Sequence, residues 1–409
     1  MISKAAPRLL ETRVLVSNMS DQLASSLLAI GLPLLAFGQT GSLSATAVVL
    51  IFSAVPTLLF GVYAGTFAEG FNRRWLVSIL NFARGAILLV AALFVQQAGL
   101  ALVAIVAFIV FTLGAFERPA ALAALPGLFG DHYQKFLAGR SGLLFLAQTV
   151  GPALGAALAT LLDPAFTFVA AGVLLIVSAL NILSIKEFDR DHINRERSHT
   201  FGQQMASVRE GLLYTAKNPI LRALLGYWVI SLMAVPLTTL PVLSYITRTE
   251  HLPQFLYGLA TSLYAAGCVI SSFLMRFVNV RGRVRLWLII PGCGYGLVAI
   301  ALLLHPNFVQ LGLLWFVWGL FYGPEQVLSQ LIFAKALAPE LSGRVFSLMT
   351  VAFSLGTTLG YIALAPLSAW VGGIGTVVLG GSLFIAATLA TFVFLPSARA
   401  MDCLDLGAA

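Results

Sequence analysis

Twelve long apolar runs, each close to the length of a membrane-spanning helix, dominate this chain. A helix that crosses the hydrocarbon core of a bilayer needs about 20 mostly apolar residues. Only 10% of the 409 residues are charged, against about 25% in soluble domains, so lipid must solvate most of the chain. The sequence therefore predicts an all-α membrane protein with twelve transmembrane helices. The runs lie near residues 14–37, 45–67, 76–95, 99–120, 141–162, 165–185, 221–246, 255–278, 286–304, 309–334, 346–370 and 374–395.

A polar stretch separates these runs into two sets of six. It extends from residue 186 to about residue 217, is charge-dense at its start, and has the spacing of an amphipathic surface helix from Phe201 to Tyr214. We therefore expect a six-helix half at residues 1–185, a loop with this helix at 186–219, and a second six-helix half at 220–409. A loop of about 30 residues is too short to hold a catalytic domain.

Basic residues are distributed unevenly between the loops. If the N-terminus is cytoplasmic, 21 of the 24 Lys and Arg residues fall in segments on that side, and only Arg248 falls in an external loop. Cytoplasmic loops of membrane proteins carry such an excess. The pattern predicts that both termini are cytoplasmic, and it explains the net charge of +8 without nucleic acid as a partner. Arg84 and Arg118 are exceptions, because they lie inside apolar runs.

Residues that commonly carry catalysis or bind metals are sparse. The 3 cysteines have no C-x-x-C spacing, and the 5 histidines fall in loops or at helix ends, so we predict no disulfide, metal site or cofactor. The sequence has no G-x-S-x-G, H-E-x-x-H or Walker motif. The chain is therefore not expected to be an enzyme or to use ATP.

Two short motifs stand out within this pattern. After the second run, Gly65 is followed by Glu69 and then by the basic pair Arg73–Arg74. The glycine allows close helix approach, and an acid at this place can face the positive N-terminal end of a neighbouring helix. In the fifth run, Gly151–Pro152 stands among small residues, which favours tight packing and a bend.

These features resemble the major facilitator superfamily, and within it the drug:proton antiporter branch that holds macrolide-efflux and enterobactin-export proteins. The stretches Phe116–Ala120, Glu210–Leu212 and Ala338–Val345 also resemble that branch. The chain departs from the superfamily pattern at Glu69, where Asp is usual. The motif around Gly151 lacks the leading and final glycines of the family pattern and has alanines there.

The resemblance implies a secondary active transporter that works by alternating access in a bacterial cytoplasmic membrane, as a monomer. The Gly-Pro motif marks exporters more than importers in this superfamily. The two basic residues after the second run can alternatively be charges that only set topology. The resemblance also implies a cytoplasmic gate or conformational motif, with the candidates Gly65, Glu69, Arg73, Arg74, Glu117, Arg118, Gly151, Pro152 and Arg344.

Polar residues within the first run point to a functional site, since a charge at the bilayer centre costs about 2.5–3.5 kcal/mol. Asn18, Asp21, Gln22 and Ser25 share one helical face, which should line a water-accessible cavity. A carboxylate that is partly removed from water binds a proton more readily, so Asp21 is a candidate for proton coupling. The alternative is a structural ion pair with Arg84, which could itself bind an anionic substrate.

The tenth and eleventh runs carry the candidates of the second half. Glu325 is the second candidate for proton coupling, and it shares a helical face with Trp318 and Tyr322. Aromatic surface beside one acid suits a large amphipathic or cationic substrate, and the alternative is an aromatic packing stripe. Thr357 and Tyr361 share a face of the eleventh run that should also line the cavity.

Taken with the resemblance, these residues predict a proton-coupled exporter of amphipathic small molecules, either drugs or a siderophore. An importer or flippase of a nutrient or lysolipid with the same fold is the alternative. Sugar uptake is less favoured, because the Asn, Gln and Trp residues that it would need are few in the apolar runs.

Overall fold

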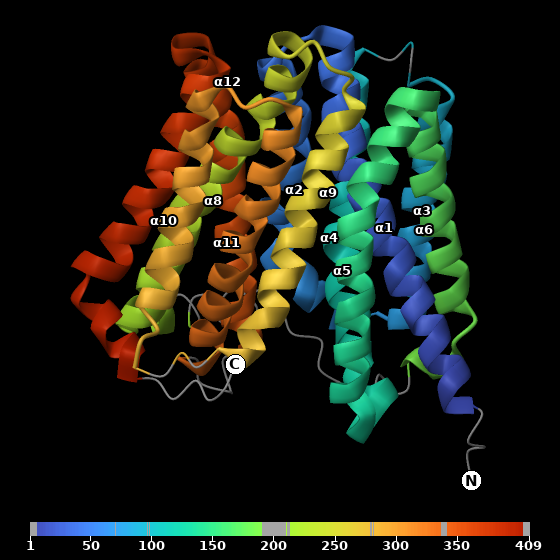
Figure 1. The fold of residues 1–409 in the computed structure, drawn as a ribbon. Helices are drawn as coiled ribbons and strands as arrows, with labels where there is room; N and C mark the ends of the chain where they lie inside the picture. Colours follow the sequence, from blue (N-terminus) through green and yellow to red (C-terminus); the bar gives the residue numbers. More distant parts are fainter. Residues whose placement is uncertain are drawn as a thin grey trace.

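The structure is a computed structural model that describes residues 6–69, 71–95, 97, 99–189, 210, 213–278, 280, 282–336 and 342–403. All regular structure within these ranges is helical (Figure 1). The long helices are α1 (Ala6–Thr40), α2 (Leu43–Glu69), α3 (Arg73–Ala92), α4 (Leu100–Phe129), α5 (Tyr133–Ala157), α6 (Pro164–Leu183), α8 (Pro219–Ser244), α9 (Phe255–Leu274), α10 (Leu286–Ile300), α11 (Phe308–Lys335) and α12 (Ser342–Leu389).

Several helices begin at sequence signals that satisfy their first backbone N–H groups. The side chains of Asp163 and Asn218 accept hydrogen bonds at the starts of α6 and α8, and each is followed by a proline in the first turn. Asn307 begins α11 with a reciprocal cap that it shares with Gln310. These caps fix where the chain enters the membrane after three of its turns.

Each of the twelve apolar runs overlaps one of these helices, and two of them are joined in α12. Gly372 separates the two parts of α12 with φ 74° and ψ 176°, a conformation that glycine adopts without a Cβ penalty. In the described part of the chain, ten helices are long and apolar enough to cross a membrane, with α12 counted once. α11, which has 28 residues and carries Glu325 and three glutamines, is not among the ten.

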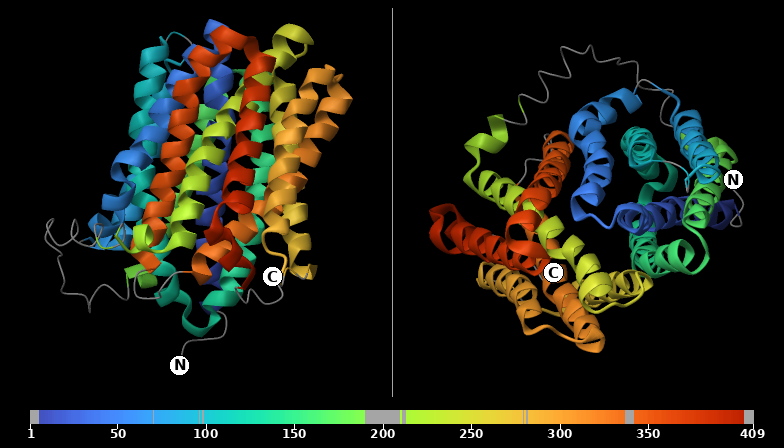
Figure 2. Two further views of the ribbon diagram at one scale, coloured as in Figure 1. Left: turned by 90° about the vertical axis from the view of Figure 1, so that its left-hand side faces the viewer. Right: turned by 90° about the horizontal axis from the view of Figure 1, so that it is seen from above.

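The helices form two bundles that lie side by side when viewed from above (Figure 2). In the N-terminal bundle, α1 packs against α5 and α6, and α3 packs against α4 and α6. In the C-terminal bundle, α8 packs against α12, and α9 packs against α11. The domain boundaries at 185 and 219 stay a prediction. The amphipathic helix expected from Phe201 to Tyr214 lies largely outside the described residues.

The two bundles meet along α2–α12 and α5–α9. The backbone N–H of Ala153 donates to Ser262 Oγ at 2.9 Å, and Ser354 Oγ donates to the carbonyl of Ala54 at 2.8 Å. Arg248 donates to the carbonyl of Gly41 and lies over the Phe37 ring. The last contact joins the α1–α2 turn to the end of α8, at the end of the molecule that lies away from both termini (Figure 1).

Candidate transport site

The polar face of α1 points into the N-terminal bundle, where Asp21 forms an ion pair. Arg84 Nη1 lies 2.7 Å from Asp21 Oδ1 and 3.9 Å from Glu117 Oε2. The residue exposures of Arg84 and Glu117 are only 2% and 4%. One guanidinium from α3 therefore lies between two carboxylates, one from α1 and one from α4. The predicted pairing of Asp21 with Arg84 is present, and Glu117 joins it.

Neutral polar groups extend this charged cluster toward α6. Arg84 Nη1 also donates to Asn81 Oδ1 at 2.8 Å, and Asn81 Nδ2 donates to Ser178 Oγ at 3.2 Å. The hydroxyls of Ser178 and Ser17 share a hydrogen bond of 2.7 Å. Gly114 leaves room for the guanidinium, because a Cβ there would lie 3.2 Å from Arg84 Cζ. The network thus fixes Arg84 through contacts from α1, α3, α4 and α6.

A cavity of about 170 Å³ opens beside this cluster. Asn18 accepts a hydrogen bond of 2.9 Å from Arg140 Nε, and Ser25 accepts one of 3.3 Å from Arg118 Nη2. Asn18, Asp21 and Gln22 therefore line this cavity together, as predicted, whereas Ser25 is not in its wall and only contacts Arg118, which is. The cavity is lined by Ser17, Asn18, Asp21, Gln22, Val77, Glu117, Arg118, Ala121, Leu122, Arg140, Leu144, Ser178, Ile182 and Phe188.

Several residues of this site were not predicted from the sequence, or were predicted to have another role. Arg140 was counted among the charges that set topology, and Ser17 and Ser178 carried no charge to draw notice. Glu117 was expected to act in a gate or in packing. Helical spacing could have identified Arg140 as part of the site. It lies four residues before Leu144, which puts both on one face of α5, and Leu144 is also in the cavity wall.

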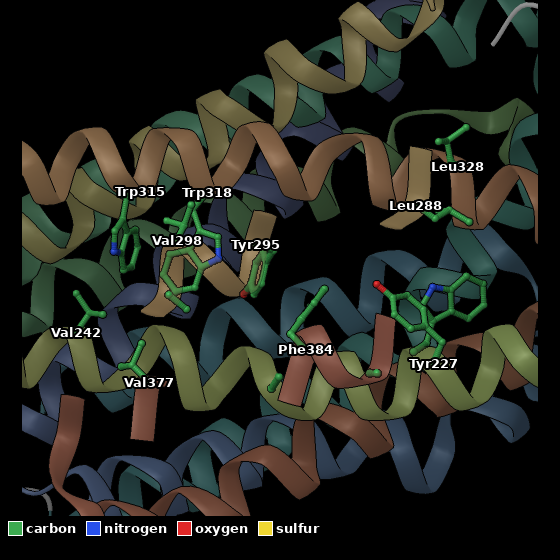
Figure 3. Close-up of a cluster of buried hydrophobic side chains, with 14 of the residues drawn as sticks. Tyr227, Val242, Leu288, Tyr295, Val298, Trp315, Trp318, Leu328, Val377 and Phe384 are labelled. Carbon is green, nitrogen blue, oxygen red and sulfur yellow. The ribbon is translucent and has the colours of Figure 1, made fainter. Parts of the chain in front are cut away.

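In the C-terminal bundle, the predicted face of α11 lies in a packed aromatic interior (Figure 3). Trp318 is 1% exposed, and its ring centroid lies 5.0 Å from the ring centroid of Tyr295. Tyr322 packs against Tyr295 and Tyr264 at centroid distances of 5.6 and 5.8 Å. These contacts favour the packing alternative for the aromatic stripe. Substrate binding by Trp318 and Tyr322 stays a prediction.

Glu325 lies in the same interior and is 2% exposed. Gln326 Nε2 is 3.4 Å from Glu325 Oε2 and 2.8 Å from the Tyr322 hydroxyl. In the described part of the chain, no Lys, Arg or His nitrogen lies within 4.0 Å of this carboxyl group. Gln330 continues the row toward the surface by donating to Gln326. The half-buried Gln326 and the exposed Gln330 form a polar face that was not predicted from the sequence.

The predicted cavity face of α12 is used partly for packing between the bundles. Thr357 Oγ1 donates to the carbonyl of Phe353 within its own helix, at 2.8 Å. Tyr361 packs against an apolar cluster that includes Ala47 of α2 and Leu237 of α8. A role for Thr357 and Tyr361 in lining a substrate cavity stays a prediction.

The candidate conformational residues are partly described. Arg73 donates to the carbonyl of Ala123 at 2.9 Å, and Arg74 donates to the carbonyl of Leu183, the last residue of α6. Both arginines thus bind backbone inside the N-terminal bundle, in addition to any effect on topology. The surroundings of Gly65 and the side chains of Glu69 and Arg344 lie outside the described part of the structure. The latch expected there stays a prediction.

The Gly-Pro motif packs α5 against two helices. A Cβ at Gly151 would overlap Ser26 of α1, and on the other side the carbonyl of Pro152 lies where a Cβ on Gly258 of α9 would reach. The small residues of α5 therefore allow close approach both within the N-terminal bundle and across to the C-terminal bundle. This confirms tight packing at the motif, whereas its link to export stays a prediction.

Comparisons with known proteins agree with this architecture. The model of the Major Facilitator Superfamily matches residues 14–246 and 237–402. The chain is 24% identical over 383 residues to the multidrug efflux pump Tap of Mycobacterium tuberculosis (strain CDC 1551 / Oshkosh), covering 91% of this chain and 90% of that protein. The Tap protein of Mycobacterium bovis matches to the same extent.

Solved structures show the same fold at low sequence identity. The nucleoside transporter NupG superposes with a TM-score of 0.77 at 10% identity, over 94% of this chain and 100% of that one. A bacterial homolog of the human lysosomal transporter Spinster gives 0.75 at 12% identity, over 98% of both chains. The chain therefore belongs to the Major Facilitator Superfamily, and it is a multi-pass membrane protein and a secondary transporter of small molecules, not an enzyme.

Proposed function

We propose that this chain exports amphipathic small molecules in exchange for protons. The observation that carries the proposal is the buried cluster in which Asp21 and Glu117 share Arg84 at the wall of a cavity. Intramembrane acids paired in this way are typical of proton and ion pathways. Similarity to multidrug efflux pumps over 91% of the chain supports export and a drug-like substrate.

The charge count of this cluster suggests how a proton would couple to transport. With both acids ionised, Asp21, Glu117 and Arg84 together carry one net negative charge. A proton on either acid makes the three residues neutral. A cationic group of the substrate would compensate the same charge, so proton and substrate would compete for it. Such competition is the requirement for exchange of the two across the membrane.

Glu325 is the second site that we propose for a proton. A buried carboxylate with no cation nearby is costly, so we expect this acid to be neutral in the conformation described. The row of Gln326 and Gln330 leads from it toward the surface. Its proton would be exchanged when the C-terminal bundle changes its packing.

Alternating access supplies the conformational change in this proposal. The two bundles would rock about the contacts on α2–α12 and α5–α9. We place both termini in the cytoplasm of a bacterium, on the basis of the Lys and Arg bias. The contact of Arg248 with Gly41 then lies on the external side, and the conformation described has that side held together.

Transport by purified protein in liposomes with an imposed pH gradient tests the proposal. Rhodamine B, a fluorescent amphipathic dye, would be followed for wild type, Asp21→Asn, Glu117→Gln and Glu325→Gln. We expect dye movement driven by the gradient in wild type and loss of at least about 90% of the rate in the first two variants. Glu187→Gln removes an exposed acid outside the cavity and serves as the matched control.

The outcomes separate the proposal from its alternatives. Gradient-driven movement that persists in both N-terminal variants would refute the coupling site. Dye movement in the direction of the proton flux would instead support the importer. If a lysolipid moves under the gradient and the dye does not, the flippase is supported.

A further inference from the structure

We propose that the cavity of the N-terminal bundle binds a zwitterionic head group, with its anionic part at Arg118 and Arg140 and its cationic part at Asp21 and Glu117. This inference rests on the proposed function, because it names the class of substrate that the transporter would carry. It adds two arginines to the site, and it assigns each side of the cavity a charge.

The arginines in the cavity wall, Arg118 and Arg140, differ from the neighbouring Arg84 in how their charge is balanced. Arg84 lies within 4.0 Å of both acids. Arg118 and Arg140 make hydrogen bonds only to the neutral groups of Ser25 and Asn18 among the described residues. Among the described residues, no carboxylate lies within 4.0 Å of Arg118 or Arg140. One wall thus carries two guanidiniums without a carboxylate at salt-bridge distance.

Such a pair of guanidiniums is suited to an anionic group. Arg140 is half-buried and Arg118 is exposed, and both lie on helices that cross the membrane. A guanidinium has five N–H donors, and one hydrogen bond leaves most of them for water or a ligand. Carboxylates and phosphates match this donor geometry, often with two parallel hydrogen bonds. An anionic group between the two side chains would replace water there.

The acid side of the cavity has the opposite excess. When both are ionised, Asp21 and Glu117 carry one more charge than Arg84 neutralises. Glu117 Oε2 is buried, and it accepts no hydrogen bond from the described residues. An ammonium or a delocalised cation near these carboxylates would compensate that charge. The cation would then compete with the proton, while the anion at the arginines would hold the head group in place.

Size and polarity of the cavity explain why only a head group fits. Sites for drug-sized ligands span about 300–1,000 Å³, whereas this cavity holds about 170 Å³. Leu122, which is 48% exposed, and Leu144 belong to its wall beside the arginines. The apolar part of an amphipathic substrate would lie over these side chains, outside the charged cavity.

A matched pair of dyes tests the inference. Rhodamine B has a carboxylate and a delocalised cation, and its ethyl ester keeps only the cation. Binding of each dye to the purified full chain in detergent would be measured by fluorescence anisotropy at neutral pH. We expect wild type to bind the free acid about tenfold more tightly than the ester, as one charge-assisted hydrogen-bond pair gives. Arg118→Gln and Arg140→Gln should each reduce this ratio, and the double variant should bring it near one.

Controls distinguish loss of the arginines from loss of the fold. Arg222→Gln removes an exposed arginine outside the cavity and should keep the tenfold ratio. Arg140→Lys keeps the positive charge and should retain part of the preference for the free acid over the ester. Unchanged binding of the ester by the double variant shows that the protein is folded. Equal binding of the two dyes by wild type, or a ratio that survives in the double variant, would overturn the inference.

The same dyes separate this inference from the proposed function. If binding shows the preference but neither dye moves under a pH gradient, the head-group site stands and proton-driven export fails. If the ester moves under the gradient and the preference is absent, export stands and the head-group site fails. Displacement of rhodamine B by lysophosphatidylcholine would support the site and identify a lipid as a source of the zwitterion. Retention of the dye in its presence would support the site for a soluble substrate.

Discussion

In the N-terminal bundle the half-buried Asp21 and the buried Glu117 lie around Arg84, whereas in the C-terminal bundle Glu325 is buried among aromatic rings with no described cation at salt-bridge distance. The first arrangement keeps charges inside the membrane by pairing them and placing them next to a polar cavity. The second leaves its acid without a described cation and surrounds it with Trp and Tyr side chains. Buried acids in the two halves are therefore expected to respond differently to substitution.

The difference separates two tasks that a transporter must perform. A cavity with charges of both signs can bind a head group and exchange a proton. A packed aromatic interior can act as a rigid body against which the other bundle moves. We therefore infer that the chemistry of transport is concentrated in the N-terminal bundle. Four substitutions test this contrast, from the largest expected effect to the smallest.

Arg84→Met should produce the largest loss of stability. It leaves the buried Glu117 and the half-buried Asp21 without their common partner, and loss of one partner of a buried pair typically costs about 3–5 kcal/mol. Unfolding in detergent, followed by thermal denaturation, would measure the effect. The triple variant with Asp21→Asn and Glu117→Gln should recover most of the stability, because it removes the uncompensated charges. Equal instability of the triple variant would show that packing of Arg84, and not its charge, matters.

Gly319→Ala should be the second most disruptive change, and it acts in the C-terminal bundle. A Cβ at this position would overlap the carbonyl oxygen of Tyr264, so α9 and α11 would have to separate. We expect a loss of about 1–3 kcal/mol, measured by the same thermal denaturation. Gly226→Ala is the matched control, because a Cβ there has open space around it. Wild-type stability of the Gly319 variant would contradict a rigid interior.

Trp228→Phe removes one hydrogen bond from the aromatic interior. Trp228 Nε1 donates to Ser329 Oγ at 3.2 Å, while the ring packs against Phe333 and Phe353. The phenylalanine keeps an aromatic ring but leaves the serine without this donor, so we expect a loss of about 1–2 kcal/mol. Ser329→Ala in the Trp228→Phe background should add little further loss, and a fully additive loss would mean that the two side chains do not interact.

Glu325→Gln should have the smallest effect on stability, within about 1 kcal/mol. A neutral carboxylic acid and an amide have similar size, and neither needs a cation. The same denaturation assay at neutral pH would check it. A loss comparable to that of Arg84→Met would show that Glu325 is ionised in the folded protein and that the contrast between the bundles is wrong.

The fold was accessible from the sequence because lipid imposes strong rules on length and polarity. The runs on either side of residues 371–373 predicted two spans, and Gly372 is where α12 changes direction. Asp163, Asn218 and Asn307 marked helix starts through ordinary capping chemistry. Such signals are local, so they survive without knowledge of the tertiary structure.

The site was accessible only in part, because it depends on contacts between helices. Helical spacing placed Asn18, Asp21 and Gln22 on one face, and intramembrane charge singled out Arg84. Spacing within α11 also grouped Trp318 with Glu325, but could not show that this face turns into its own bundle. Arg140 was taken as a charge that sets topology, since a basic residue near a helix end fits that reading as well.

Proton release on substrate binding is the most direct test of the view that the N-terminal bundle carries the coupling chemistry. Purified protein in weakly buffered detergent solution would be mixed with a saturating amount of rhodamine B while the pH is recorded. Wild type and Glu325→Gln should each release roughly one proton per bound dye. The double variant Asp21→Asn with Glu117→Gln should bind the dye more weakly and should release no proton at a dye concentration that saturates it. Release that persists in the double variant, or that is lost in Glu325→Gln, would contradict this assignment and place the coupling site in the C-terminal bundle.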